Sequence, residues 1–197
     1  MAERLVQVRG FNGFSYADIA HELDVTKASL HYHFAGKAQL GHALIERYAR
    51  EFAAALAAIE REGADAPAML RAYASLYADV LRRERMCLCG MLASEYETLP
   101  RPMREAVVAF FNDNEVWLAR VLEAGRDEGT LRFEGSPHEI ARLIVSALEG
   151  AMLVARPYGD VTRLEAVAHH LVGGLAGAPE GAATRASARS RRRTARR

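Results

Sequence analysis

The stretch SYADIAHELDVTKASLHYHF, residues Ser15 to Phe34, decides the fold of the first part of this chain. Its spacing predicts two short helices joined by a tight turn, because a small residue, a turn residue and two apolar anchors stand where such a unit needs them. These positions are Ala20, Asp24, Val25 and Leu30, and Ile19 completes the apolar face. A scaffold of this kind mainly serves to present its second helix to a DNA groove.

The residues at the turn and at the start of the second helix suit the backbone conformations expected there. The backbone at the turn usually enters left-handed space, which Asp24 tolerates better than most side chains do. Thr26 is the expected N-cap of a helix over residues 27–33, with its hydroxyl accepting from free backbone N–H groups. Apart from Leu30 and Ala28, every side chain of that helix can donate a hydrogen bond.

Residues 15–40, SYADIAHELDVTKASLHYHFAGKAQL, resemble the DNA-binding region of the TetR family of transcriptional regulators. The similarity extends from about Arg9 to Tyr48, and His31 departs from it, because the family most often has tyrosine there. The residues that match the family's short helix and the turn beyond it are Lys27, Leu30, Tyr32, His33, Phe34 and Lys37.

The resemblance implies a set of DNA contacts. Those expected at base edges or nearby phosphates are Thr26, Lys27, Ser29 and Tyr32, and those expected on the DNA backbone are Ser15, His31, His33 and Lys37. The chemistry agrees, because lysine can bond guanine acceptors, hydroxyls serve bases or phosphates, and helix N-termini favour anionic oxygens.

The first helix is expected to be short. Only nine residues precede the Gly10-Phe11 pair, whereas the family's first helix is longer. We expect its apolar residues to pack on Ile19 and Leu30, and these residues are Leu5, Val8 and Phe11. A native start upstream of Met1 would explain the difference, and the alternative is a weakened DNA-binding domain that leaves a helical protein-interaction module.

Composition indicates a globular protein with a sizeable core, since 50% of its 197 residues are hydrophobic and 26% are charged. No apolar run reaches the length of a membrane span, and the opening MAERLVQVRG lacks the apolar centre of a secretory signal. We therefore expect a cytoplasmic protein with no membrane partner.

Charge is concentrated at the C-terminus. Residues 177–197 hold seven arginines and one glutamate, a net +6 within a chain of net +1, which leaves −5 on residues 1–176. This segment has almost no large apolar side chain, so we expect it to be disordered. It is either a basic arm that adds salt-dependent affinity for DNA or a solvated tail without a role.

The rest of the chain has helical periodicity throughout, which predicts an all-α fold. Helices are expected over residues 38–60, 68–85, 86–99, 102–128, 137–156 and 163–175. We predict a three-helix helix-turn-helix DNA-binding domain over residues 1–45, a helical ligand-binding and dimerisation domain over residues 46–176, and the arginine-rich tail.

The helix over residues 137–156 is apolar around more than one face, so two sides of it need cover. We expect one side to meet its own domain and the other a second copy, as the last two long helices do in TetR-like proteins. The interface residues are expected to be Leu143, Ala147, Ala151, Val167 and Leu171. Two recognition helices related by a two-fold axis would then read a palindrome.

Aromatic and sulfur-containing residues in the middle of the chain are expected either to line a ligand cavity or to form a plain core. The candidate ligand residues are Tyr73, Tyr77, Cys89, Phe111, Asn114, Trp117, Glu149 and Met152. By resemblance, an unknown small-molecule effector that binds here would move the long linker helix and respace the recognition helices.

Cys87 and Cys89 are the only cysteines. They serve either as buried small residues or as an electrophile or redox sensor whose thiol pKa is lowered by nearby Arg83 and Arg85. The sequence has no zinc-like cysteine–histidine spacing, no phosphate loop and no recognisable nucleophile setting, so we expect no metal, no cofactor and no catalytic residues.

The sequence thus predicts a dimeric regulator whose partners are double-stranded DNA, a second copy and a small molecule. The resemblance favours a repressor that the small molecule releases from a palindromic operator. The alternatives are the helical interaction module and the cysteine-based sensing repressor.

Overall fold

The computed structural model describes residues 1–176, and every helix or strand assigned in this part of the chain is a helix. The only strand-like feature there is an isolated bridge between Leu131 and Ala176. The all-α expectation is therefore confirmed. The predicted arginine-rich tail, residues 177–197, lies outside the described residues.

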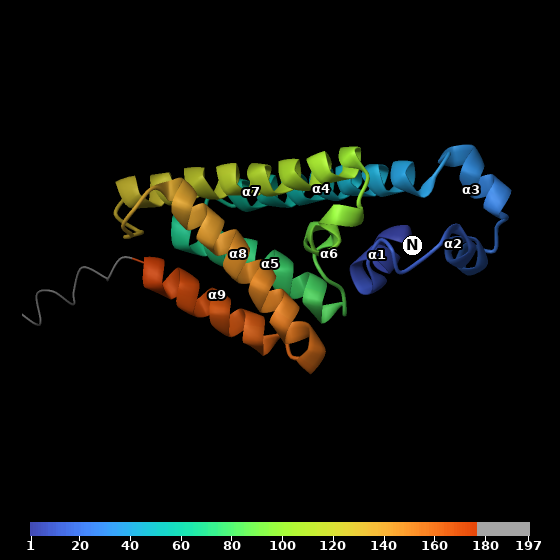
Figure 1. Ribbon diagram of the computed structural model, residues 1–197. Coiled ribbons are helices and arrows are strands. Elements are labelled where there is room, and N and C mark those ends of the chain that lie inside the picture. Colours follow the sequence, from blue (N-terminus) through green and yellow to red (C-terminus); the bar gives the residue numbers. More distant parts are fainter. Residues whose placement is uncertain (177–197) are drawn as a thin grey trace, which may run out of the picture.

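Three short helices form a small unit, which we call the head: α1 (Ala2–Arg9), α2 (Tyr16–Leu23) and α3 (Lys27–His33). Its core includes Leu5, Phe11 and Ile19, which are at most 5% exposed, with Leu30 packed against them. Leu5 and Phe11 are thus buried as expected, whereas Val8 is only half-buried and lies outside this core, and Val6 of the same helix is buried instead. Figure 1 shows the head at one end of an elongated molecule, with α3 at the outer edge.

A single long helix, α4 (Lys37–Arg61), joins the head to the remaining helices, which we call the body. Its apolar residues recur every four positions, and Leu40, Tyr48 and Leu56 are buried. They face α7 (Arg101–Asp127), and the two helices run side by side in Figure 1. At Gly41 a Cβ would lie 2.6 Å from Cε of Met103, so glycine permits this close approach.

The body packs α4 and α7 against three other long helices: α5 (Ala66–Arg82), α8 (Pro137–Ala155) and α9 (Thr162–Leu175). Capping residues determine where two of them begin. The Asp65 carboxylate accepts from the backbone N–H of Ala68 over 2.8 Å, and the Ser136 hydroxyl accepts from that of Glu139 over 3.2 Å. Short elements complete the body: α6 (Leu88–Ser94) and the 3-10 turns η1 (Tyr96–Thr98) and η2 (Arg156–Tyr158).

Two predicted helix bounds were wrong. The helix expected over residues 68–85 ends at Arg82, and Glu84 adopts a left-handed conformation with a φ of 58°. The helix expected over residues 86–99 begins only at Leu88, after the N-cap Cys87, and it is divided into α6 and η1 because the backbone at Glu95 leaves the helical region, with φ −107° and ψ 14°. No helix within residues 1–176 combines the length and apolar character needed to cross a membrane.

Candidate nucleic-acid interface and regulatory site

The connection between α2 and α3 has the local geometry that the sequence predicts. Asp24 is left-handed, with φ 53° and ψ 46°, and the backbone N–H of Val25 closes the turn on the carbonyl of Ala20 over 3.0 Å. The Thr26 hydroxyl accepts from the N–H of Ser29 over 3.2 Å, which caps α3. These contacts fix the direction in which α3 leaves the turn.

The helix α3 contains no buried residue, although Leu30 is half-buried and anchors it to the head. The Tyr32 side chain is 86% exposed, with its ring edge-on to that of His33 at 5.3 Å. The predicted contact residues that lie exposed on or beside this helix are Thr26, Lys27, Ser29, His31, Tyr32 and His33. The structure therefore leaves these hydrogen-bonding side chains exposed on α3, at the outer edge of the head (Figure 1).

His31 packs back against the head. Its ring lies 4.7 Å from that of Tyr16, and its Nδ1 lies 3.3 Å from the carbonyl oxygen of Ala35. Tyr16 in turn donates from its hydroxyl to the carbonyl of Phe34 over 3.2 Å. This contact with a carbonyl oxygen requires a proton on Nδ1 of His31, so Nε2 can donate to a phosphate only when the ring carries both protons.

Ser15 and Lys37 use their polar atoms inside the head. The Ser15 hydroxyl donates to the Asp18 carboxylate over 2.6 Å, and this bond and the backbone one lower the pKa of Asp18. The Lys37 ammonium donates to the carbonyls of Phe11 and Phe14 and lies over both rings, at 4.6 and 4.3 Å from their centres. Partial burial lowers the pKa of Lys37, and the negative charges of Glu95 and Asp18 act in the opposite direction by raising it. A direct phosphate contact from Lys37 would require breaking these bonds.

Most of the predicted ligand residues meet in the interior of the body. Tyr73 bonds to the hydroxyl of Tyr77 over 3.0 Å and to Asn114 over 3.1 Å, and its ring stacks on Trp117 at 5.7 Å. Phe111 is half-buried against the ring of Phe110. These contacts make the region a packed, mutually bonded aromatic cluster.

Glu149 and Met152 of α8 approach the start of α6. The Met152 sulfur accepts from the backbone N–H of Cys87 over 3.1 Å, and a Cβ on Gly90 would lie 2.2 Å from Oε2 of Glu149. Oε1 of Glu149 is buried without a hydrogen-bond partner, as is Nε1 of Trp117. Burial raises the pKa of Glu149 to about 7, partly opposed by its hydrogen bond with Cys87.

The alternative in which Arg83 and Arg85 lower a thiol pKa finds no support in the structure. Cys87 and Cys89 are both free and at most 1% exposed, and burial raises the pKa of each well above its usual value, with the charge of Glu149 adding to the effect. Arg83 is exposed and Arg85 half-buried, and neither lowers the pKa of a thiol. The buried-residue interpretation is the one that the geometry supports.

The predicted pairing residues lie along the outer side of α8 and α9. Leu143 is 52% exposed and Val167 is 38% exposed, whereas Ala147, Ala151 and Leu171 are half-buried. Leu153 and Val154, at 61% and 57% exposure, belong to the same helix, and the sequence analysis did not single them out. Exposed aliphatic side chains next to small residues make this an apolar face.

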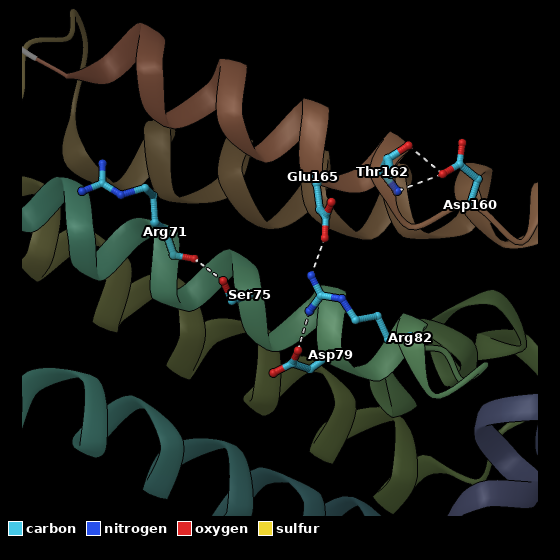
Figure 2. Close-up of polar contacts among 7 residues, drawn as sticks. All are labelled: Arg71, Ser75, Asp79, Arg82, Asp160, Thr162 and Glu165. Atoms are coloured by element: carbon cyan, nitrogen blue, oxygen red, sulfur yellow. Dashed lines mark hydrogen bonds and ion pairs between the residues drawn. The ribbon is translucent and has the colours of Figure 1, made fainter.

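A surface hollow of about 270 Å³ lies elsewhere, between α5 and α9. Figure 2 shows its polar rim, where Arg82 bonds to Asp79 over 2.6 Å and also to Glu165 of α9. The hollow is lined by none of the eight predicted ligand residues. Because Arg82 is already paired with two carboxylates, it contributes a link between the helices.

Sequence reasoning missed the side chains of the body that bond to the head, among them Glu95 and Arg156. Glu95 accepts from the backbone N–H groups of Phe11 and Asn12, and Arg156 donates to the carbonyl of Val8. Neither residue belongs to a local motif, and sequence separations of 84 and 148 residues leave no signal in the pattern.

Two family models match the chain. Residues 1–44 match the family described as bacterial regulatory proteins, tetR family, and residues 66–171 match the Tetracyclin repressor-like, C-terminal domain. The chain is 30% identical to the transcriptional regulator AcuR of Cereibacter sphaeroides over 155 residues, covering 75% of this chain and 69% of AcuR.

Two further relatives cover more of the chain. The HTH-type transcriptional repressor NemR of Escherichia coli is 27% identical over 172 residues, covering 85% of this chain and 86% of NemR. The crystal structure of a TetR-family transcriptional regulator from Agrobacterium tumefaciens superposes with a TM-score of 0.86 at 32% identity, covering 89% of this chain and 94% of that one.

Proposed function

Because the chain belongs to the TetR family of transcriptional regulators, we propose that it is a dimeric, ligand-responsive repressor that a small molecule releases from a palindromic operator. The observation that carries this proposal is the rigidly capped α3, which exposes every hydrogen-bonding side chain it has. The description of NemR as a repressor supports the direction of regulation.

In this proposal α3 lies in the major groove of DNA. Lys27 and Ser29 follow the Thr26 cap, so they stand at the end of the helix that favours anionic oxygens and base acceptors. Tyr32 reaches a base edge or a phosphate one turn later, and His33 holds the DNA backbone. His31 also supports the contacts to the DNA backbone. Ser15 and Lys37 support them mainly by fixing the shape of the head.

Two heads are needed, because one short helix makes too few contacts to select a site in a genome. We propose that the apolar face of α8 and α9 pairs with the same face of a second copy, which buries Leu143 and Val167 in both. The half-sites then lie about 34–36 Å apart, or a multiple of that distance, as expected for a two-fold helix-turn-helix dimer.

The effector is proposed to enter the aromatic cluster of the body. Support comes from the two buried polar atoms there that have no partner, Oε1 of Glu149 and Nε1 of Trp117, since a ligand that bonds to them removes a desolvation cost. The effector must prefer the head spacing that DNA does not accept, and DNA then weakens effector binding by the same factor.

The geometry of the head argues against the interaction-module alternative. That alternative assumes that a short first helix cannot hold the head together, yet Leu5 and Val6 of α1 are buried and the α2–α3 turn keeps its geometry. The cysteine-sensing alternative loses its stated support, because both thiols are buried with raised pKa values.

Selection of DNA from a random pool by the purified protein tests the proposal. We expect an inverted repeat to be enriched, and we expect the Lys27→Ala variant to lose that enrichment. Arg101→Ala is the matched control, because it removes an exposed cation from the body rather than from α3. Enrichment of no sequence by the native protein, at any salt concentration, would overturn the proposal.

A further inference from the structure

We infer that Glu95 is a positioning residue that fixes the angle of the DNA-binding head against the body, so that η1 and α6 hold the head together with α4. The inference rests on the proposed function for its effect on DNA, but its structural part concerns this chain alone. Glu95 lies between α6 and η1 and is half-buried.

The Glu95 carboxylate spans the junction between body and head. One oxygen accepts from the backbone N–H of Phe11 over 2.5 Å, and the other accepts from that of Asn12 over 3.1 Å. The Asn12 side chain returns a bond to the hydroxyl of Thr98, in η1, over 2.7 Å. Gly10 lies against the same carboxylate with a φ of +81°, and a Cβ there would be 2.9 Å from it. The turn after α1 is therefore shaped to receive this carboxylate.

The opposite side of the same turn is held by α4. Lys37, the first residue of α4, donates its ammonium to the carbonyls of Phe11 and Phe14. The backbone donors of the turn are thus bonded to the body, and its acceptors are bonded to the linker helix. Charge-assisted bonds of this kind are stronger than neutral ones, so the turn is clamped between Glu95 and Lys37.

Two further contacts from the body reach α1. The backbone N–H of Met86 donates to the carbonyl of Gln7 over 3.2 Å, and Arg156 donates to the carbonyl of Val8. Arg156 begins η2, directly after α8, and its guanidinium also contacts the sulfur of Met91 in α6 at 3.4 Å. The body therefore holds the head at α1 and at the turn, from α6, η1 and η2 together.

This arrangement links the buried cluster to the head by a short path. Gly90 of α6 packs so closely on Glu149 that a Cβ would approach Oε2 to 2.2 Å. A ligand that displaces the Glu149 side chain would therefore push on α6. Glu95 is the C-cap residue of that helix. Dense packing transmits such shifts, so a displacement of α6 would carry Glu95, and with it the turn after α1, in the same direction.

Removing the carboxylate is the test, with Glu95→Ala and the shape-conserving Glu95→Gln as variants. Glu97→Ala is the matched control, because Glu97 is an exposed glutamate two residues away in η1. Amide exchange of Phe11 and Asn12 should speed up by about tenfold or more in Glu95→Ala, by less in Glu95→Gln, and not at all in the control.

A distance measurement separates positioning from simple stability. Spin labels at Ser29→Cys in α3 and Glu123→Cys in α7, on chains diluted with unlabelled protein, should give a narrow distance distribution that broadens in Glu95→Ala. The melting temperature of the body should not change. Equal distributions in Glu95→Ala and the native chain, or equal broadening in Glu97→Ala, would overturn the inference.

The effect on DNA is judged separately. Glu95→Ala should discriminate less than the native protein between its inverted repeat and the same repeat with one extra base pair between the half-sites. Unchanged discrimination would mean that Glu95 does not set head spacing. If the native protein bound no DNA, the proposed function would fail, whereas the exchange and distance measurements would still decide the role of Glu95.

Discussion

The hydroxyl of Tyr73 donates a hydrogen bond to Oδ1 of Asn114 over 3.1 Å, and neither residue is more than 2% exposed. Asn114 uses its amide nitrogen to donate to the carbonyl of Phe110 over 2.8 Å, and Tyr77 completes the set at 3.0 Å from the Tyr73 hydroxyl. The bond joins α5 to α7 in an interior where an unpaired polar atom is costly, so its partners stabilise the body only as a set.

Removing the Tyr73 hydroxyl should therefore destabilise the body. We expect Tyr73→Phe to lower the free energy of unfolding by about 1–3 kcal/mol, because Oδ1 of Asn114 is left buried without this donor. Urea denaturation followed by circular dichroism measures the change. The matched control Tyr158→Phe removes a hydroxyl from a residue that is 63% exposed and should change the free energy by less than about 0.5 kcal/mol.

Glu149 should make stability depend on pH. Its pKa in the folded protein is raised to about 7 from 4.5, so between these values the folded state holds a proton that the unfolded state has lost. The neutral Glu149 carboxyl therefore contributes fully to the free energy of unfolding below about pH 4.5, and this contribution is lost as the pH rises through 7. The loss in the free energy of unfolding is about 3 kcal/mol. The neighbouring ionisable groups stay neutral over this range, because burial raises their pKa values: Tyr48, Tyr73, Tyr77, Cys87 and Cys89.

The measurement is the free energy of unfolding at pH 5 and at pH 7.5 for the native chain and for Glu149→Gln. The native chain should lose stability relative to the variant as the pH rises, because glutamine does not ionise. Glu123→Gln, at an exposed position of α7, should track the native chain. If the free energies of unfolding of the native chain and of Glu149→Gln differed by the same amount at both pH values, the raised pKa of the Glu149 carboxyl would be contradicted.

The thiols of Cys87 and Cys89 should be unreactive in the folded protein at pH 7.5. Burial excludes reagents and raises both pKa values, so almost no thiolate is present. Mass spectrometry after a brief exposure to iodoacetamide should find no adduct on the native chain and two adducts on the chain unfolded in urea. Rapid modification of the native chain would return the cysteine-sensing alternative to consideration.

The exposed side chains of α3 should matter for DNA and not for folding. Lys27→Ala and Tyr32→Ala should each weaken binding to the selected inverted repeat by about 1–3 kcal/mol, if they contact base edges. Their melting temperatures should equal that of the native chain, because neither side chain is buried. Fluorescence anisotropy with the labelled repeat gives the affinity, and full affinity in both variants would move the base contacts away from α3.

The apolar face of α8 and α9 should control assembly. Leu143→Glu places a charge in the proposed two-fold interface and should shift the protein from dimer to monomer in sedimentation equilibrium, because an unpaired charge is costly to bury. Val108→Glu is the matched control, since Val108 is 45% exposed on α7 and lies outside the proposed face. A dimer that tolerates Leu143→Glu and is dissociated by Val108→Glu would place the interface elsewhere.

The amino-acid sequence alone determined the local features of this protein. Asp24 in left-handed space, Thr26 as the cap of α3 and the helical pattern of the body follow from backbone sterics and periodicity within a few residues, so a single sequence reveals them. Only the tertiary structure decided the features that depend on distant segments. Lys37 points into the head, both thiols are buried beside Glu149, and Glu95 and Arg156 hold the head to the body, because burial and charge partners come from chain segments that folding brings together.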